Sequence, residues 1–172
     1  METISVRLRT PPSSTNPWLA LAGWLTLSAL AGALGAFASA NAKDFYATLV
    51  QPGWAPPAWL FGPVWTALYA MMAVAAWLVW RERGWTRASG ALGLFVLQLA
   101  LNALWSWLFF AWHRGGMAFA DILALWLVLA ATVVAFARIR RAAAWLLAPY
   151  LAWVTFATAL NYAVWQLNPR TL

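Results

Sequence analysis

Five long apolar runs separated by mostly short connectors dominate this chain of 172 residues. They cover residues 18–39, 63–80, 91–112, 117–137 and 143–167. A helix needs about 20 mostly apolar residues to cross the hydrocarbon core of a membrane. Lipid offers backbone amides no partners, so a crossing segment must satisfy them itself, as a helix does. The runs therefore predict an all-α integral membrane protein, a bundle of five transmembrane helices.

The composition excludes a soluble fold, because 65% of the residues are hydrophobic and only 9% are charged. A soluble domain carries roughly 25% charged residues. The net charge of +7 does not indicate nucleic-acid binding, since the arginines lie at the ends of apolar runs rather than along one basic face. The chain has no cysteine and one histidine. We therefore expect no metal site, and a haem held by two histidines of one chain is excluded.

The connectors after the second run are short, which predicts a single membrane domain over residues 18–168. Residues 1–17 are expected to be a flexible tail rich in helix breakers, and residues 169–172 a C-terminal tail. The first apolar run is too long for a cleaved signal peptide, whose apolar region has about 7–15 residues. We interpret it as a retained helix. Its Ser28, Gly32 and Ala36 repeat at a spacing typical of close helix packing.

Basic residues are divided unevenly between the two sides that five crossings define. One side carries Arg7, Arg9, Arg81, Arg83, Arg87, Arg138, Arg140 and Arg141, whereas the other carries Lys43, Arg114 and Arg170. Loops rich in basic residues stay in the cytoplasm. The charge pattern predicts a cytoplasmic N-terminus and an external C-terminus, in a bacterial inner membrane.

The first connector contains the stretch QPGWAPPAWLFGPVW, residues 51–65, with four prolines and three tryptophans. Proline has no amide hydrogen, so such a segment leaves few unmet donors at membrane depth. Trp54, Trp59 and Trp65 supply broad apolar faces. We predict a Pro/Trp-rich lid loop between helices 1 and 2. The alternative, an aromatic belt at the membrane surface, explains most tryptophans but not the prolines.

Polar and aromatic side chains recur at helical spacing on three of the runs. The faces comprise Gln98, Asn102, Trp105, Ser106 and Phe109; Trp153, Ala157, Leu160, Asn161 and Val164; and Trp65, Leu68, Tyr69 and Met72. Amides within a membrane are costly unless they find partners. Each marks either an interhelical contact or a cavity, and three such faces below a lid favour a cavity.

Several motifs then occur in a recognisable order: Phe45-Tyr46, Leu49, Pro52, Trp54, Pro56-Pro57, Trp59, FGPVWTALYAMM, QLALNALWSWLFF, Asp121 and PYLAWVTFATALNY. Together they resemble the TspO/translocator-protein family of tryptophan-rich sensory proteins, over about residues 32–168. The resemblance implies a five-helix bundle, usually a homodimer, with a cavity capped by the first loop. It also implies binding of porphyrins and, in animals, of cholesterol and benzodiazepine-type drugs.

The same resemblance assigns roles to single residues. It makes Trp65 and Trp153 the cavity tryptophans that bind porphyrin and are linked to its proposed light-driven breakdown, and it places Tyr46, Asn102, Phe109 and Ala157 in the ligand shell. The full set of predicted ligand-binding residues is Tyr46, Trp54, Trp59, Trp65, Gln98, Asn102, Trp105, Phe109, Trp153, Ala157, Leu160 and Asn161. Gln166 stands where a sterol-binding segment needs a basic residue, which argues against tight sterol binding.

The leading functional hypothesis is a membrane receptor for porphyrins, such as protoporphyrin IX or haem, and for similar flat apolar ligands, with a role in tetrapyrrole regulation or stress sensing. Lys43, His113 and Arg114 either pair with acidic groups of such a ligand or are ordinary interfacial residues. The alternatives are a light- and oxygen-dependent porphyrin-degrading enzyme using Trp65 and Trp153, and a porphyrin or lipid transporter. We expect no obligatory cofactor; the expected partners are membrane lipid and a second copy of the chain, not nucleic acid.

The predicted orientation can be tested by labelling single cysteines, since the native chain has none. In intact cells, an impermeant maleimide should label the Arg170→Cys variant and should not label Arg83→Cys until the cells are lysed. The reverse pattern would show that the orientation is inverted.

Overall fold

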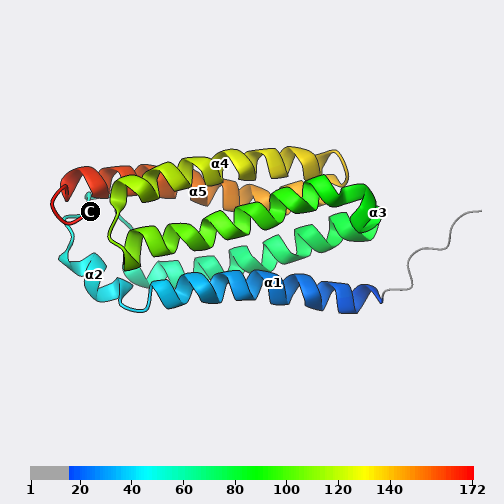
Figure 1. Ribbon diagram of the computed structural model, residues 1–172, viewed down its shortest axis with the longest axis horizontal. Helices are drawn as coiled ribbons and strands as arrows, with labels where there is room; N and C mark the ends of the chain where they lie inside the picture. The colour runs from blue at the N-terminus through cyan, green and yellow to red at the C-terminus, as the bar shows by residue number, and fades with distance from the viewer. Residues whose placement is uncertain (1–15) are drawn as a thin grey trace, which may run out of the picture.

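The computed structural model describes residues 16–172, so the predicted N-terminal tail lies almost wholly outside the described part of the chain. The regular structure of this part is helical (Figure 1). Its elements are α1 (Pro17–Ala38), α2 (Ala42–Thr48), the short 3-10 turn η1 (Ala58–Leu60), α3 (Phe61–Ser106), the π-helical turn η2 (Trp107–Ala111), α4 (Gly115–Ala137) and α5 (Arg141–Leu167).

The start of α1 has a local explanation in the sequence. Asn16 accepts a hydrogen bond at its side-chain oxygen from the amide of Trp18, at 3.0 Å, and Pro17 occupies the first helical position. Asparagine at the cap and proline directly after it are both favoured at helix N-termini. The retained first helix expected from the apolar run therefore begins one residue before the predicted boundary.

The long helix α3 folds back on itself at Gly84. This glycine has φ 68° and ψ 177°, outside the helical region, and it divides α3 into a first arm, residues 61–83, and a second arm, residues 85–106. Figure 1 shows the two arms side by side and antiparallel. A positive φ suits glycine because it has no Cβ. The sequence predicted a ten-residue connector at 81–90, but the helix continues through its arginines and only Gly84 departs from helical geometry.

Four helical segments of the described chain are long and apolar enough to cross a membrane. They are Pro17–Ala38, Ala58–Ala111, Gly115–Ala137 and Arg141–Leu167, and the second has 54 residues because it contains both arms of α3. The structure is thus an all-helical bundle with the composition of an integral membrane protein.

The arginine-rich segments gather at one end of the bundle. The start of α1, the bend at Gly84 and the turn between α4 and α5 lie together there, while α2 and the C-terminus lie at the opposite end (Figure 1). An ion pair joins Arg140 to Glu82 at 3.1 Å, and the Arg81 guanidinium lies 5.0 Å from the centre of the Trp77 ring. The basic segments 81–87 and 138–141 thus lie at the end opposite α2. Arg7 and Arg9 lie outside the described residues, and the side of the membrane stays a prediction.

Apolar side chains form two buried clusters. The larger one fills the bundle between both arms of α3, α4 and α5, and includes Met72, Phe95, Leu129 and Tyr150. The smaller one lies at the α2 end and contains Tyr46, Leu49, Leu108, Phe109, Leu160 and Val164, with Leu172 packed against it. Residues 169–172, expected as a tail, form a turn in which the amides of Thr171 and Leu172 donate to the Asn168 carbonyl.

The contact between the start of α4 and the end of α5 depends on glycine. A Cβ at Gly116 would lie 2.9 Å from Cζ2 of Trp165, closer than such atoms approach. We expect Gly116→Ala to destabilise the protein by about 1–3 kcal/mol through overpacking, seen as a lower midpoint of thermal unfolding in detergent. Gly93→Ala is the matched control, because nothing lies within 4 Å of its added methyl group. Equal midpoints for the two variants would contradict this account of the contact.

Candidate functional site: a cavity between α1, α2 and α3

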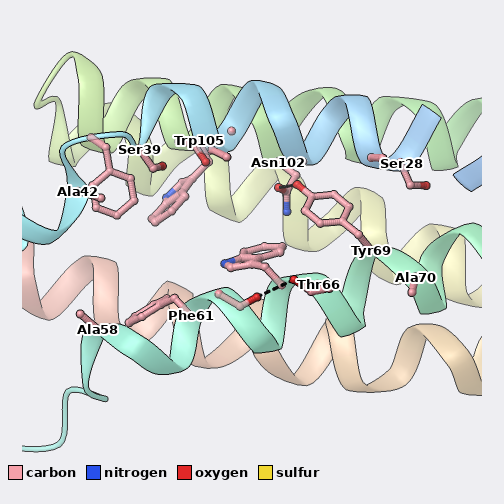
Figure 2. Close-up of a pocket in the computed structure, with 18 of the residues that line it drawn as sticks. Ser28, Ser39, Ala42, Ala58, Phe61, Thr66, Tyr69, Ala70, Asn102 and Trp105 are labelled. Atoms are coloured by element: carbon pink, nitrogen blue, oxygen red, sulfur yellow. Dashed lines mark hydrogen bonds between the residues drawn. The ribbon is translucent and has the colours of Figure 1, made fainter. Parts of the chain in front are cut away.

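A cavity of about 770 Å³ lies between α1, α2 and both arms of α3 (Figure 2). Its lining residues are Leu25, Ser28, Ala29, Gly32, Gly35, Ala36, Ser39, Ala42, Lys43, Tyr46, Ala58, Phe61, Gly62, Trp65, Thr66, Tyr69, Ala70, Asn102, Trp105, Ser106 and Phe110. They come from α1 and α2, from η1 and the first arm of α3, and from the second arm of α3 with η2, so the cavity is a product of the tertiary fold.

The walls of the cavity differ in character. The α1 wall is made largely of glycine, alanine and serine, whereas α3 contributes the aromatic residues Phe61, Trp65, Tyr69 and Trp105. The glycines of α1 allow close approach, since a Cβ at Gly32 would lie 3.0 Å from the Tyr69 ring. Figure 2 shows Phe61 and Trp105 toward the end marked by Ala42 and Ala58, with Asn102 and Tyr69 deeper in the bundle. The result is an apolar space with aromatic rings on one side and small side chains on the other.

A chain of hydrogen bonds through Asn102 supports the deep part of the cavity. The Tyr69 hydroxyl donates to Oδ1 of Asn102 at 2.8 Å, and Nδ2 of Asn102 donates to the Tyr150 hydroxyl at 2.7 Å. This chain ties the first arm of α3 to the second arm and to α5. The indole of Trp65 packs against both tyrosines, with ring centres 5.6 Å from Tyr69 and 6.1 Å from Tyr150. Asn102 is therefore both a cavity residue and an interhelical contact.

Trp105 is held by a second amide. Its indole N–H donates to Oδ1 of Asn161 at 2.8 Å, and Nδ2 of Asn161 donates to the Gly115 carbonyl at 3.2 Å. The Trp105 ring also stacks on Phe109, with ring centres 5.2 Å apart and planes 19° from parallel. Asn161 thus orients a cavity tryptophan from behind the wall.

The structure brings only some of the predicted ligand-binding residues to this cavity. Tyr46, Trp65, Asn102 and Trp105 line it. Phe109, Ala157, Leu160 and Asn161 instead line a second space of about 30 Å³, whose wall also includes Tyr46 and Trp105. Gln98 is fully buried between the arms of α3, where its Nε2 lies 3.7 Å from the sulfur of Met72.

Phe61 separates Trp153 from the main cavity. The Phe61 ring lines the cavity and meets Trp153 edge to face, with ring centres 5.7 Å apart. Trp153 does not belong to the cavity lining. The predicted pair of cavity tryptophans is therefore unequal in this structure, with Trp65 in the wall and Trp153 behind Phe61.

Helix α2 forms the end wall of the cavity, through Ala42, Lys43 and Tyr46. The stretch 51–65, expected as a lid, is divided: Phe61 and Trp65 line the cavity. Trp54 and Trp59 do not line it; they are 51% and 72% exposed, and Trp54 packs against Phe156. Sequence reasoning missed α2 because the seven-residue helix has no apolar run of its own. Burial raises the pKa of the Tyr46 phenol above its ordinary value.

One charged side chain is part of the described cavity lining. Lys43 is the only charged residue among the described residues that line it. His113, at the same end of the bundle, stacks on Phe45 with ring centres 4.0 Å apart, and neither His113 nor Arg114 lines the cavity. In residues 16–172, no three His, Asp or Glu side chains come together as a metal site would require.

Known proteins share sequence with most of this chain. Residues 24–166 match the profile of the TspO/MBR family. The chain is 41% identical to the translocator protein of Bos taurus over 155 residues, which is 88% of this chain and 92% of the bovine protein. It is 44% identical to the tryptophan-rich protein TspO of Chlorobaculum tepidum over 135 residues, 77% of this chain and 85% of that protein.

A tryptophan-rich sensory protein of Cereibacter sphaeroides is 38% identical over 149 residues, covering 84% of this chain and 92% of the relative. The family match spans most of the chain, and these relatives are similar over nearly their whole lengths. The resemblance recognised from the sequence motifs is thereby confirmed. The chain is a membrane protein of the TspO/MBR family, to which the translocator proteins also belong.

Proposed function

We propose that this protein is a membrane receptor that binds a porphyrin, or a similar flat apolar molecule, in the cavity between α1, α2 and α3. The observation that carries the proposal is a space of about 770 Å³ bounded by Phe61, Trp65, Tyr69, Trp105 and Phe110. Small-molecule sites are typically apolar and aromatic cavities of roughly 300–1,000 Å³ with a few polar groups. Both the size and the lining fit that description.

The contrast between the two walls favours a flat ligand. Small side chains on α1 leave an even surface, and the indoles on α3 offer faces on which a conjugated ring can stack. Aromatic stacking contributes about 0.5–1.5 kcal/mol beyond the burial of apolar area. The hydrogen bonds of Tyr69, Asn102 and Trp105 fix these rings before a ligand arrives, so little side-chain freedom is lost on binding.

Lys43 supports a ligand with an acidic edge. It lies at the α2 end, where an ammonium group is near the water, and most of the remaining lining is apolar. A carboxylate at that end can pair with Lys43 while the apolar body of the ligand is buried. Porphyrins with two propionates on one edge have this distribution of charge.

We also propose that both arms of α3 cross the membrane, giving five crossings. At 1.5 Å per residue each arm is about 33–35 Å long, enough for the hydrocarbon core. With the arginine-rich end in the cytoplasm, α2 and the cavity entrance face outward, in a bacterial inner membrane. The segment 49–57 then covers α2 from outside as a lid, and the homodimer implied by the resemblance stays a prediction.

One observation favours the second candidate function, light-driven porphyrin breakdown. Trp65 stands in the cavity wall, where its indole can exchange an electron with an excited pigment, and Phe61 bridges the cavity to Trp153. Pigment loss in the light would distinguish an enzyme from a binding protein.

Titration with protoporphyrin IX, followed by tryptophan fluorescence in detergent, tests the role of Trp65. Trp65→Phe should weaken binding by about two- to tenfold, because phenylalanine still stacks but offers a smaller ring. Light-dependent bleaching, if the protein performs it, should fall much further, since phenylalanine is harder to oxidise.

Trp145→Phe is the matched control, because Trp145 is 76% exposed and does not line the cavity. Bleaching at the wild-type rate in Trp65→Phe and Trp153→Phe would exclude the enzyme, and equal affinities in Trp65→Phe and the wild type would exclude this site.

A ligand whose carboxylates are esterified tests whether Lys43 pairs with those carboxylates. Lys43→Gln should lower the affinity for protoporphyrin IX by about two- to fivefold, the range of an exposed ion pair. It should leave the affinity for the dimethyl ester unchanged. Arg114→Gln is the control, since Arg114 lies at the same end but outside the cavity. An equal loss for acid and ester would show that Lys43 does not pair with the carboxylates.

A further inference from the structure

The loop between α2 and η1, residues 49–57, is attached to the rest of the protein in an unusual way. Within the described part of the chain, its hydrogen bonds either stay inside residues 46–60 or go to Asn168, the residue directly after α5. The two attached positions, Val50 and Asn168, are 118 residues apart in the sequence. One side chain therefore makes the hydrogen-bonded connection between this loop and the bundle.

The geometry of this connection is that of a small piece of β-ladder. Oδ1 of Asn168 accepts from the Val50 amide at 2.9 Å, and Nδ2 donates to the Val50 carbonyl at 2.9 Å. The same Nδ2 also donates to the Val164 carbonyl in the last turn of α5, at 2.7 Å. Asn168 is 8% exposed. A carboxamide carries both a donor and an acceptor, so it can bond to the N–H and the C=O of one residue at once.

The restraint reaches the cavity through α2. Gln51, next to Val50, donates from Nε2 to the Tyr46 carbonyl at 2.7 Å. The Leu49 amide donates to the same carbonyl at 3.3 Å. Tyr46 belongs to the end wall of the cavity. Fixing Val50 to α5 therefore fixes the C-terminal end of α2, and with it the wall.

The other contacts of this region do not set its position in the same way. Trp54 meets Phe156 edge to face, and Phe45 stacks on His113. Aromatic contacts tolerate sliding and tilting, whereas hydrogen bonds weaken steeply when misaligned. The Asn168 amide is thus the directional restraint on this wall.

We propose that Asn168 is a positioning residue, a latch that holds the loop 49–57 and α2 across the end of the cavity and so sets how fast a ligand enters and leaves. This inference rests on the proposed function, because it assumes that the cavity takes a ligand. Asn168 does not touch the cavity. Its loss should therefore change the rates of association and dissociation together, and the equilibrium affinity much less.

The latch can be tested without any ligand. Ser106 lines the cavity, and Ser106→Cys introduces the sole thiol into a chain that lacks cysteine. In detergent, a water-soluble maleimide should label this thiol at least tenfold faster in a background with Asn168→Ala, because opening no longer breaks the buried hydrogen bonds to Val50. Asn41→Ala is the matched control, since this asparagine precedes α2 and its side chain caps no helix; it should label at the parent rate.

Stopped-flow binding of protoporphyrin IX gives the second readout. Asn168→Ala should raise both rate constants about tenfold and change the dissociation constant by less than threefold. Asn168→Asp keeps an acceptor for the Val50 amide but loses the donors, so its rates should be intermediate. Circular dichroism checks folding, and if Asn168→Ala unfolds, the Asp variant carries the test.

The outcomes separate the two proposals. Unchanged labelling in a folded Asn168 variant overturns the latch, even if porphyrin binds normally. A loss of affinity with unchanged association also overturns it, because Asn168 would then act on the bound state alone. Faster labelling in a protein that binds no porphyrin in any variant supports the latch and overturns the proposed ligand.

Discussion

Inside a membrane a polar side chain must find its partner within the protein, and the site depends on how Asn102 meets this requirement. Its amide joins Tyr69 on the first arm of α3 to Tyr150 on α5, while Asn102 itself lies on the second arm. Lipid offers no competing partner, so breaking the chain would leave buried groups unsatisfied. The three segments are held in register, and Trp65, which packs on both tyrosines, is held with them.

The cavity exists because the helices around it have different side chains. The glycines and alanines of α1 admit the rings of α3, and the aromatic wall is supported from behind by Asn161 and Phe109. At one end, a helix of seven residues closes the space and supplies its lysine. That helix is held from α5 through Asn168. The residues that line the cavity and the asparagine that holds its end wall are therefore different.

The sequence was a good guide to the amide side chains within the bundle, because such groups need hydrogen-bond partners inside the protein. Asn102 and Asn161 were expected to mark either an interhelical contact or a cavity, and Asn102 does both. The sequence-based prediction was incomplete for Trp153, whose place relative to the cavity depends on its contact with Phe61. Trp153 was expected on the cavity wall opposite Trp65, but it does not line the cavity and instead contacts Phe61, which does. Tyr46 was predicted as a ligand residue, but the helix that carries it was not, because the seven residues of α2 contain no apolar run.

The sequence by itself determined that the chain is helical, that it lives in a membrane and which family it belongs to, because apolar length, charge distribution and ordered motifs are local properties of the chain. The tertiary structure alone decided which side chains share a space. Whether Trp65 or Trp153 faces the cavity depends on helix rotation and on the ring of Phe61. The pairing of Asn168 with Val50 likewise joins positions 118 residues apart. No local pattern encodes such contacts, since they depend on how the packed helices place both partners at once.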